Sequence, residues 1–129
     1  MWALLSLAIG SFGIGMTEFT VMGLLPDIAG ALLPNQTAAD PDAAIAQAGW
    51  LISLYALGVV VGAPTIAGLV ARFPRHRVMV LLALALTVFN ALTVIAPNFE
   101  LVAVSRFLAG LPHGAYFGIG ALVAADVLG

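Results

Sequence analysis

Three ionisable side chains interrupt apolar stretches of this sequence: Glu18, Arg106 and His113. Glu18 is the only charged residue in segment 2–26. An ionisable group inside an apolar membrane segment is costly, and such groups usually mark ion pathways or proton relays. Histidine also changes charge near neutral pH, which suits a proton relay. Glu18, Arg106 and His113 are therefore candidate functional residues, and His113 is a candidate proton relay.

Each of these residues also has a structural interpretation. The Arg106 side chain can extend to the membrane surface, and Glu18 can remain a neutral acid. His113 can form a hydrogen bond between helices, and Asn90, a polar residue of another apolar stretch, can do the same. The residue types alone leave these alternatives open.

Composition indicates the elements that hold these residues. The chain has 129 residues, of which 63% are hydrophobic and 8% are charged, whereas a soluble domain has about 25% charged residues. Four apolar runs, at 2–26, 50–71, 78–96 and 101–127, reach the roughly 20 residues that cross a bilayer as a helix. We predict an all-α membrane protein in which the one domain, 1–129, has transmembrane helices at about 2–26, 41–71, 78–96 and 99–127.

Residue types also exclude some chemistry. The sequence has no cysteine, which excludes disulfides and thiolate metal sites, and it has no metal-ligand or nucleophile–base spacing. We therefore expect no enzymatic activity, no metal and no cofactor.

The positive charges predict an orientation. Three of the four Lys and Arg residues, Arg72, Arg75 and Arg77, lie between the second and third runs. Cytoplasmic loops carry an excess of such residues, so this loop and the N-terminus are expected in the cytoplasm. In the first outward loop, Asp40 can cap a helix that begins at Pro41.

Polar residues of several predicted helices fall at one depth. Counted from the outer helix ends at 1.5 Å per residue, Glu18, Asn90 and Arg106 each lie roughly 9–12 Å below the outer surface. Tyr55 lies close to this level. Glu18 and Arg106 are therefore candidates for a pair, and a substrate cavity is expected to be lined by Thr17, Tyr55, Asn90 and Tyr116.

Small residues indicate how the helices pack. Glycines four residues apart let helix backbones approach closely in lipid, where no hydrophobic effect drives the helices together. Pro64 and Pro112 lie inside predicted helices and are expected to kink them. The expected packing glycines are Gly58, Gly62, Gly110, Gly114 and Gly118.

Three segments, "GMTEFTVMGLLPDIAG", "GWLISLYALGVVVGAP" and "SRFLAGLPHGAYFGIGALVAA", resemble a known family. It is the major facilitator superfamily, in its drug:proton antiporter (12-spanner) branch of sugar-efflux and arabinose-efflux-permease-like proteins. Members have about twelve helices in two halves. The resemblance implies that this chain is an N-terminal fragment, with the first four helices of a six-helix N-terminal half.

Two shorter motifs carry the resemblance further. "RFLAGLPHG" is similar to a fourth-helix motif, matched by Arg106 and Gly110, whose arginine is tied to proton coupling in the family. Antiporters of the family often carry an acidic residue on the first helix, as Glu18 is here. "GLVARFPRHRV" resembles the cytoplasmic loop motif, but Ala71 takes the place of the usual Asp. The family's cytoplasmic latch is therefore in doubt, although the loop arginines can still bind anionic lipid.

The resemblance implies a proton-coupled efflux transporter of the bacterial inner membrane that works by alternating access. Its partners would be the lipid bilayer, protons, a small-molecule substrate such as a sugar or drug, and the remaining helices of a longer protein, but no nucleic acid. Two alternatives stay open. One is a complete small four-helix multidrug antiporter that acts as a dimer, and the other is a non-transporting membrane scaffold.

Overall fold

The computed structural model describes residues 1–129, and all of its regular elements are helices. They are α1 (Trp2–Gly23), α2 (Leu25–Leu32), α3 (Pro34–Ala39), α4 (Pro41–Ala48), α5 (Trp50–Val70), α6 (Arg75–Ile95) and α7 (Phe99–Leu128). Four segments are long and apolar enough to cross a membrane: α1, α4 with α5, α6 and α7. The predicted all-α fold with four membrane-spanning helices is therefore confirmed.

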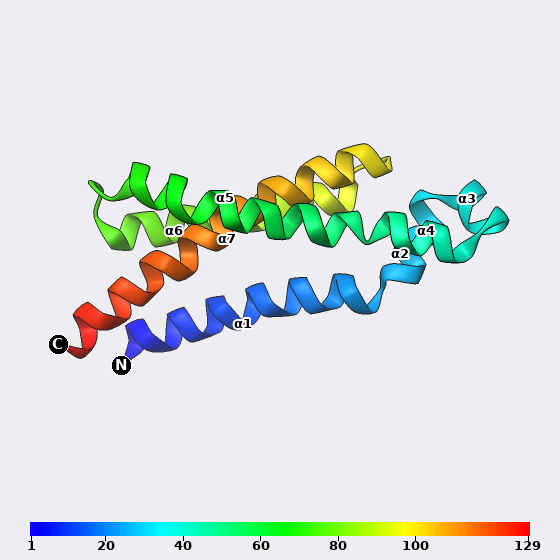
Figure 1. Ribbon diagram of the computed structural model, residues 1–129. Helices are drawn as coiled ribbons and strands as arrows, with labels where there is room; N and C mark the ends of the chain where they lie inside the picture. Colours follow the sequence, from blue (N-terminus) through cyan, green and yellow to red (C-terminus); the bar gives the residue numbers. More distant parts are fainter.

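The four long helices alternate in direction. In Figure 1, α1 and α6 run toward the end where α2, α3 and α4 gather, while α5 and α7 run away from it. Both termini and the connection between α5 and α6 consequently lie at the opposite end. An ion pair between Arg75 and Asp126 joins the start of α6 to the last turns of α7 at that end.

The first predicted helix was too long at its C-terminal end. It was expected to reach residue 26, but α1 ends at Gly23 and α2 begins at Leu25. Pro26 explains the break, because it has no backbone N–H and its ring would clash with the carbonyl of Met22 in a continuous helix. In the structure Pro26 lies in the first turn of α2, where proline is tolerated.

The third predicted helix was too short at its N-terminal end. It was expected from residue 78, but α6 begins at Arg75, directly after Pro74. Arg75 and Arg77 therefore belong to the first turn of α6 rather than to a loop.

The segment between α1 and α5 consists of three short helices, α2, α3 and α4. The carboxylate of Asp40 accepts a hydrogen bond from the backbone N–H of Ala43 at 3.1 Å, which confirms the predicted cap of α4. The sequence did not predict α2 and α3. The Thr37 hydroxyl donates to the carbonyl of Ala29 at 3.1 Å and ties α3 to α2. Fully buried alanines let these short helices pack closely: Ala29, Ala44 and Ala48.

Glycines bring α5 and α7 into backbone contact. A Cβ added at Gly58 would overlap the carbonyl oxygen of Phe107, and one added at Gly110 would overlap the carbonyl oxygen of Tyr55. Gly62 and Gly114 lie in the same interface. Close approach of this kind is how helices associate in lipid. Gly118 differs, because no atom lies within 4 Å of the place where its Cβ would be.

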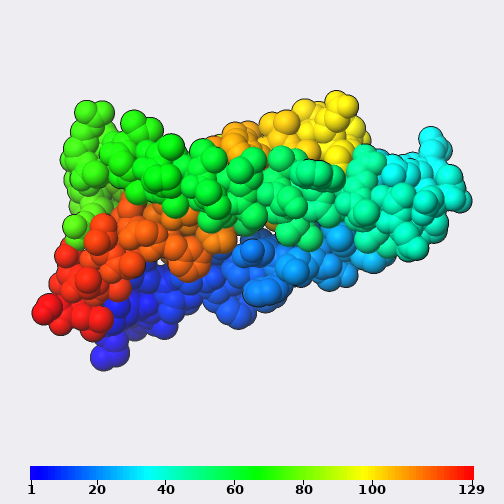
Figure 2. All heavy atoms as spheres, in the orientation of Figure 1, coloured from blue at the N-terminus to red at the C-terminus, as the bar shows by residue number.

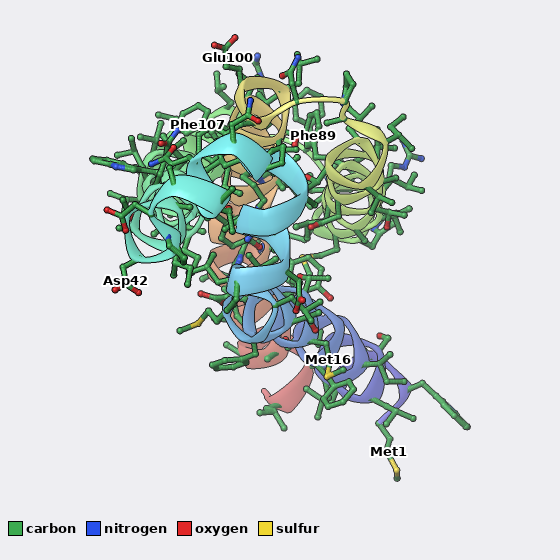
Figure 3. All side chains as sticks on the ribbon, turned by 90° about the vertical axis from the view of Figure 1, so that its right-hand side faces the viewer. Met1, Met16, Asp42, Phe89, Glu100 and Phe107 are labelled. Carbon is green, nitrogen blue, oxygen red and sulfur yellow. The ribbon has the colours of Figure 1, made fainter.

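A smaller core joins α1, α6 and α7. Ile14 is the only residue of α1 that is buried, and it packs with Leu82, Leu86 and Tyr116. In Figure 2 the blue α1 lies along the lower side of α7. Seen from the α2 end, α1 and the last turns of α7 lie below α5 and α6 (Figure 3). Most of its large apolar side chains, Phe12 and Phe19 among them, are exposed and suit a lipid or protein environment.

Candidate functional site

Tyr55 of α5 lies at the centre of a buried polar cluster. Its hydroxyl is 2.7 Å from Nδ1 of His113, and the guanidinium carbon of Arg106 lies 4.1 Å from the centroid of its ring. The first contact is a hydrogen bond, and the second is a cation–π interaction. Tyr55 and Arg106 are each only 2% exposed. One tyrosine therefore contacts two of the three predicted proton-coupling residues.

Helix geometry explains how one side chain reaches both partners. Arg106 and His113 are seven residues apart on α7, about two turns or 10 Å, and they lie on nearly the same face. Gly110 lies between them and contacts the backbone of Tyr55. Because a glycine occupies this point, the backbone of α5 comes close enough for the tyrosine to lie between the two side chains.

Arg106 is a buried cation without a counter-ion in contact. Its Nε has no hydrogen-bond partner, and no carboxylate lies within 4.0 Å of its guanidinium. It does not extend to the surface of the chain. A buried charge needs compensation from hydrogen bonds or opposite charge, and here the face of the Tyr55 ring supplies only part of it.

Glu18 is the negative charge that acts on this cluster. It is half-buried on α1, and its carboxylate lies within electrostatic range of Tyr55, Arg106 and His113. It does not form an ion pair with Arg106 within 4.0 Å. The acid and the base therefore face one cluster without touching, and Tyr55 lies against the base.

A hollow of about 370 Å³ opens between α1, α6 and α7. Three of the four predicted cavity residues line it, namely Thr17, Asn90 and Tyr116, whereas Tyr55 does not. The Asn90 amide donates to the carbonyl of Leu86 on its own helix at 2.8 Å. The Tyr116 hydroxyl reaches α1 at Gly10, where a Cβ would overlap it. This hollow is largely apolar with a few polar groups, as is usual for small-molecule sites.

Two features near the cluster, a hydrogen bond and a second hollow, had no clear signal in the sequence. The hydroxyls of Thr93 on α6 and Ser105 on α7 are 2.9 Å apart and form a hydrogen bond between helices. Arg106 also borders a second, mostly apolar hollow of about 220 Å³ beside α1 and α2. Apolar helices contain many hydroxyl residues, and only the rotation of each helix decides which of them meet.

The three arginines of segment 72–77 lie away from the cluster, at the end that holds both termini. Arg75 pairs with Asp126, and the guanidinium carbon of Arg72 lies 5.5 Å from the centroid of the Phe73 ring. Arg77 borders an apolar hollow of about 240 Å³ between α5 and α6. All three arginines are exposed and contribute nothing to the Tyr55 cluster.

Comparison with known proteins identifies relatives over nearly the whole chain. The family model of the Major Facilitator Superfamily matches residues 7–129. The inner membrane transport protein YdhP of Escherichia coli (strain K12) is 46% identical over 127 residues, which are 98% of this chain and 30% of that protein. The putative transporter AraJ of the same organism is 38% identical over 125 residues, 97% of this chain and 29% of that protein.

A third relative carries a more specific name. The chloramphenicol resistance protein of Streptomyces lividans is 30% identical over 122 residues, 95% of this chain and 29% of that protein. No solved structure matches the chain. The chain thus spans about 30% of the length of these relatives, two of which are named as transporters. None of the three is named as an enzyme.

Proposed function

Because this integral membrane chain belongs to the major facilitator superfamily, we propose that it is part of a proton-coupled efflux transporter that works by alternating access. The observation that carries the proposal is the buried Arg106, whose charge no contacting carboxylate balances, with the acid Glu18 on the neighbouring helix. Efflux is further supported by the relative that is named for chloramphenicol resistance.

Proton exchange at Glu18 is the proposed energy-coupling step. When the cavity opens to the cytoplasm, Glu18 releases its proton, and the ionised carboxylate is attracted to the guanidinium of Arg106. A small-molecule substrate then binds in the hollow lined by Thr17, Asn90 and Tyr116. When the cavity opens outward, Glu18 takes up a proton, the attraction to Arg106 is lost and the substrate leaves. Because the proton and the substrate move in opposite directions, the proton gradient drives export.

The arginine-rich end of the bundle is proposed to face the cytoplasm of a bacterial cell. Arg72, Arg75 and Arg77 lie there with both termini, and the positive-inside rule assigns such an end to the cytoplasm. Single cysteines test this orientation, since the chain has none of its own. A maleimide that cannot cross the membrane should label Asn35→Cys in intact spheroplasts but not Ala71→Cys.

Uphill transport in vesicles tests the coupling. The full-length protein is reconstituted with an imposed proton gradient, and Glu18→Gln is compared with Glu100→Gln. Glu100 is a matched control because it is an exposed acid in the first turn of α7 that projects away from the other helices (Figure 3). Glu18→Gln should abolish uphill transport and leave membrane insertion intact, whereas Glu100→Gln should keep both. Unchanged uphill transport by Glu18→Gln would refute the proposal.

The same vesicles separate the alternatives. A non-transporting scaffold predicts that neither variant nor the wild type moves substrate against a gradient. A complete four-helix dimer predicts that the 129-residue chain alone is sufficient for transport. The family match supports the first proposal over this dimer.

A further inference from the structure

Tyr55 has no role in the cavity that the proposed function uses. It was expected to line the substrate cavity, yet it is 2% exposed and is absent from the lining of the hollow between α1, α6 and α7. Its side chain instead contacts Arg106 through the ring face and His113 through the hydroxyl. A phenol that is buried against a cation and an imidazole is placed to control the proton positions between them.

The direction of the hydrogen bond between Tyr55 and His113 is coupled to the position of the imidazole proton. At 2.7 Å, the Tyr55 hydroxyl and Nδ1 of His113 form a hydrogen bond in which either group can be the donor. When His113 is neutral and the phenol donates, Nδ1 is unprotonated and the imidazole carries its proton on Nε2. When His113 is charged, Nδ1–H donates and the phenol becomes the acceptor. Protonation of His113 therefore reverses the direction of this hydrogen bond.

Charges from two further positions act on the same histidine. The carboxylate of Glu18 on α1 and the guanidinium of Arg106 on α7 carry opposite charges, and both lie within electrostatic range of His113. The titratable residues of α6 are Arg75, His76 and Arg77, and all lie in its first turn. The polar and charged groups that face His113 are thus Tyr55, Glu18 and Arg106.

We propose that Tyr55 is a positioning residue that holds neutral His113 in the Nε2–H tautomer and links its protonation to the Arg106 guanidinium on the tyrosine ring. The ring holds the guanidinium of Arg106 against α5. The direction of the hydroxyl's hydrogen bond changes with the charge of His113, which lies two helical turns from Arg106 on α7. The proposal rests on the proposed proton coupling, and it adds a residue that neither contacts substrate nor exchanges a proton with solvent.

Tyr55→Phe isolates the hydroxyl, because it keeps the ring beneath Arg106. Tyr55→Leu removes both contacts. The matched control is Thr93→Val, which removes another hydroxyl hydrogen bond between helices, the one to Ser105 at 2.9 Å. The three variants are made in the full-length protein, and thermal stability of the purified protein serves as the folding check. If Tyr55→Leu does not fold, Tyr55→Phe alone decides the question.

Nitrogen-15 NMR of labelled histidine reads the tautomer directly, with the His113 signal assigned by its loss in His113→Gln. The wild type and Thr93→Val should show one tautomer, Nε2–H. Tyr55→Phe should change the ratio of tautomers by about two- to tenfold, as expected for the loss of one hydrogen bond between neutral groups. Tyr55→Phe should also shift the pH dependence of proton-driven transport. If the hydroxyl had a purely structural role, this pH dependence would not change.

A single unchanged tautomer together with a wild-type pH profile in Tyr55→Phe would overturn the role of Tyr55. An equal change in Thr93→Val would also overturn it, because the effect would then belong to any lost helix contact. Uphill transport that persists in Glu18→Gln would instead refute the proton coupling itself, so the two failures are distinguishable.

Discussion

Replacing Gly62 by alanine tests whether backbone contact between α5 and α7 builds the site. An added Cβ would lie 2.5 Å from the Cα of Leu111 and 2.6 Å from its carbonyl carbon, whereas ordinary contact begins at 3.4 Å. Both atoms belong to the backbone and cannot rotate away, so the two helices must separate by about 1 Å. Overpacking of this kind costs about 1–3 kcal/mol. We expect Gly62→Ala to lower the free energy of unfolding of the full-length protein by that amount.

Gly68 supplies the matched control on the same helix. It is exposed, and no atom lies within 4 Å of the place where its Cβ would be. Alanine favours a helix over glycine by about 0.5–1 kcal/mol, so Gly68→Ala should leave stability unchanged or raise it. The assay is unfolding by added SDS in mixed micelles, followed by circular dichroism. An equal loss of stability in the two variants, or none in Gly62→Ala, would refute the packing argument.

Three further substitutions test local features of the fold. Asp40→Ala removes the cap of α4 and should cost about 1 kcal/mol, seen as roughly fivefold faster hydrogen exchange at the amide of Ala43. Asn98→Ala removes the corresponding cap of α7 and should cost a similar free energy of unfolding, seen as a lower thermal midpoint. An unchanged midpoint would show that the cap is unimportant. Arg75→Gln should cost less than about 1 kcal/mol in chemical denaturation, because Arg75 and Asp126 are 46% and 64% exposed. A larger loss would indicate a partner beyond Asp126.

Composition and hydrophobic runs were sufficient to predict the four long helices. In lipid a spanning segment must satisfy its own backbone hydrogen bonds, so an apolar run of about 20 residues leaves almost no choice but a helix. Asp40 before Pro41 gave an equally local signal for the start of α4. The short helices α2 and α3 each have a proline in the first turn but no capping side chain, and their packing against α4 is not encoded in the local sequence.

Counting residues along the helices predicted the level of the site residues but not which of their side chains are in contact. Counting residues correctly brought Arg106 and Tyr55 to one level, since rise per residue is a fixed property of a helix. The expected pairing of Glu18 with Arg106 depended on how α1 is rotated and how far it lies from α7, and no ion pair forms. The hydrogen bond from Tyr55 to His113 depends on the glycine contacts that set the distance between α5 and α7.

Infrared difference spectroscopy tests the central claim most directly, since it observes the proton on the carboxyl group itself. The full-length protein is cycled between acidic and alkaline buffer in a lipid film, and the band of a protonated carboxylic acid is followed. The account predicts that one component of this band, which appears on acidification in the wild type and in Glu100→Gln, is missing in Glu18→Gln. Identical carboxylic acid bands in the wild type and Glu18→Gln would contradict it, because the proton would then be carried elsewhere.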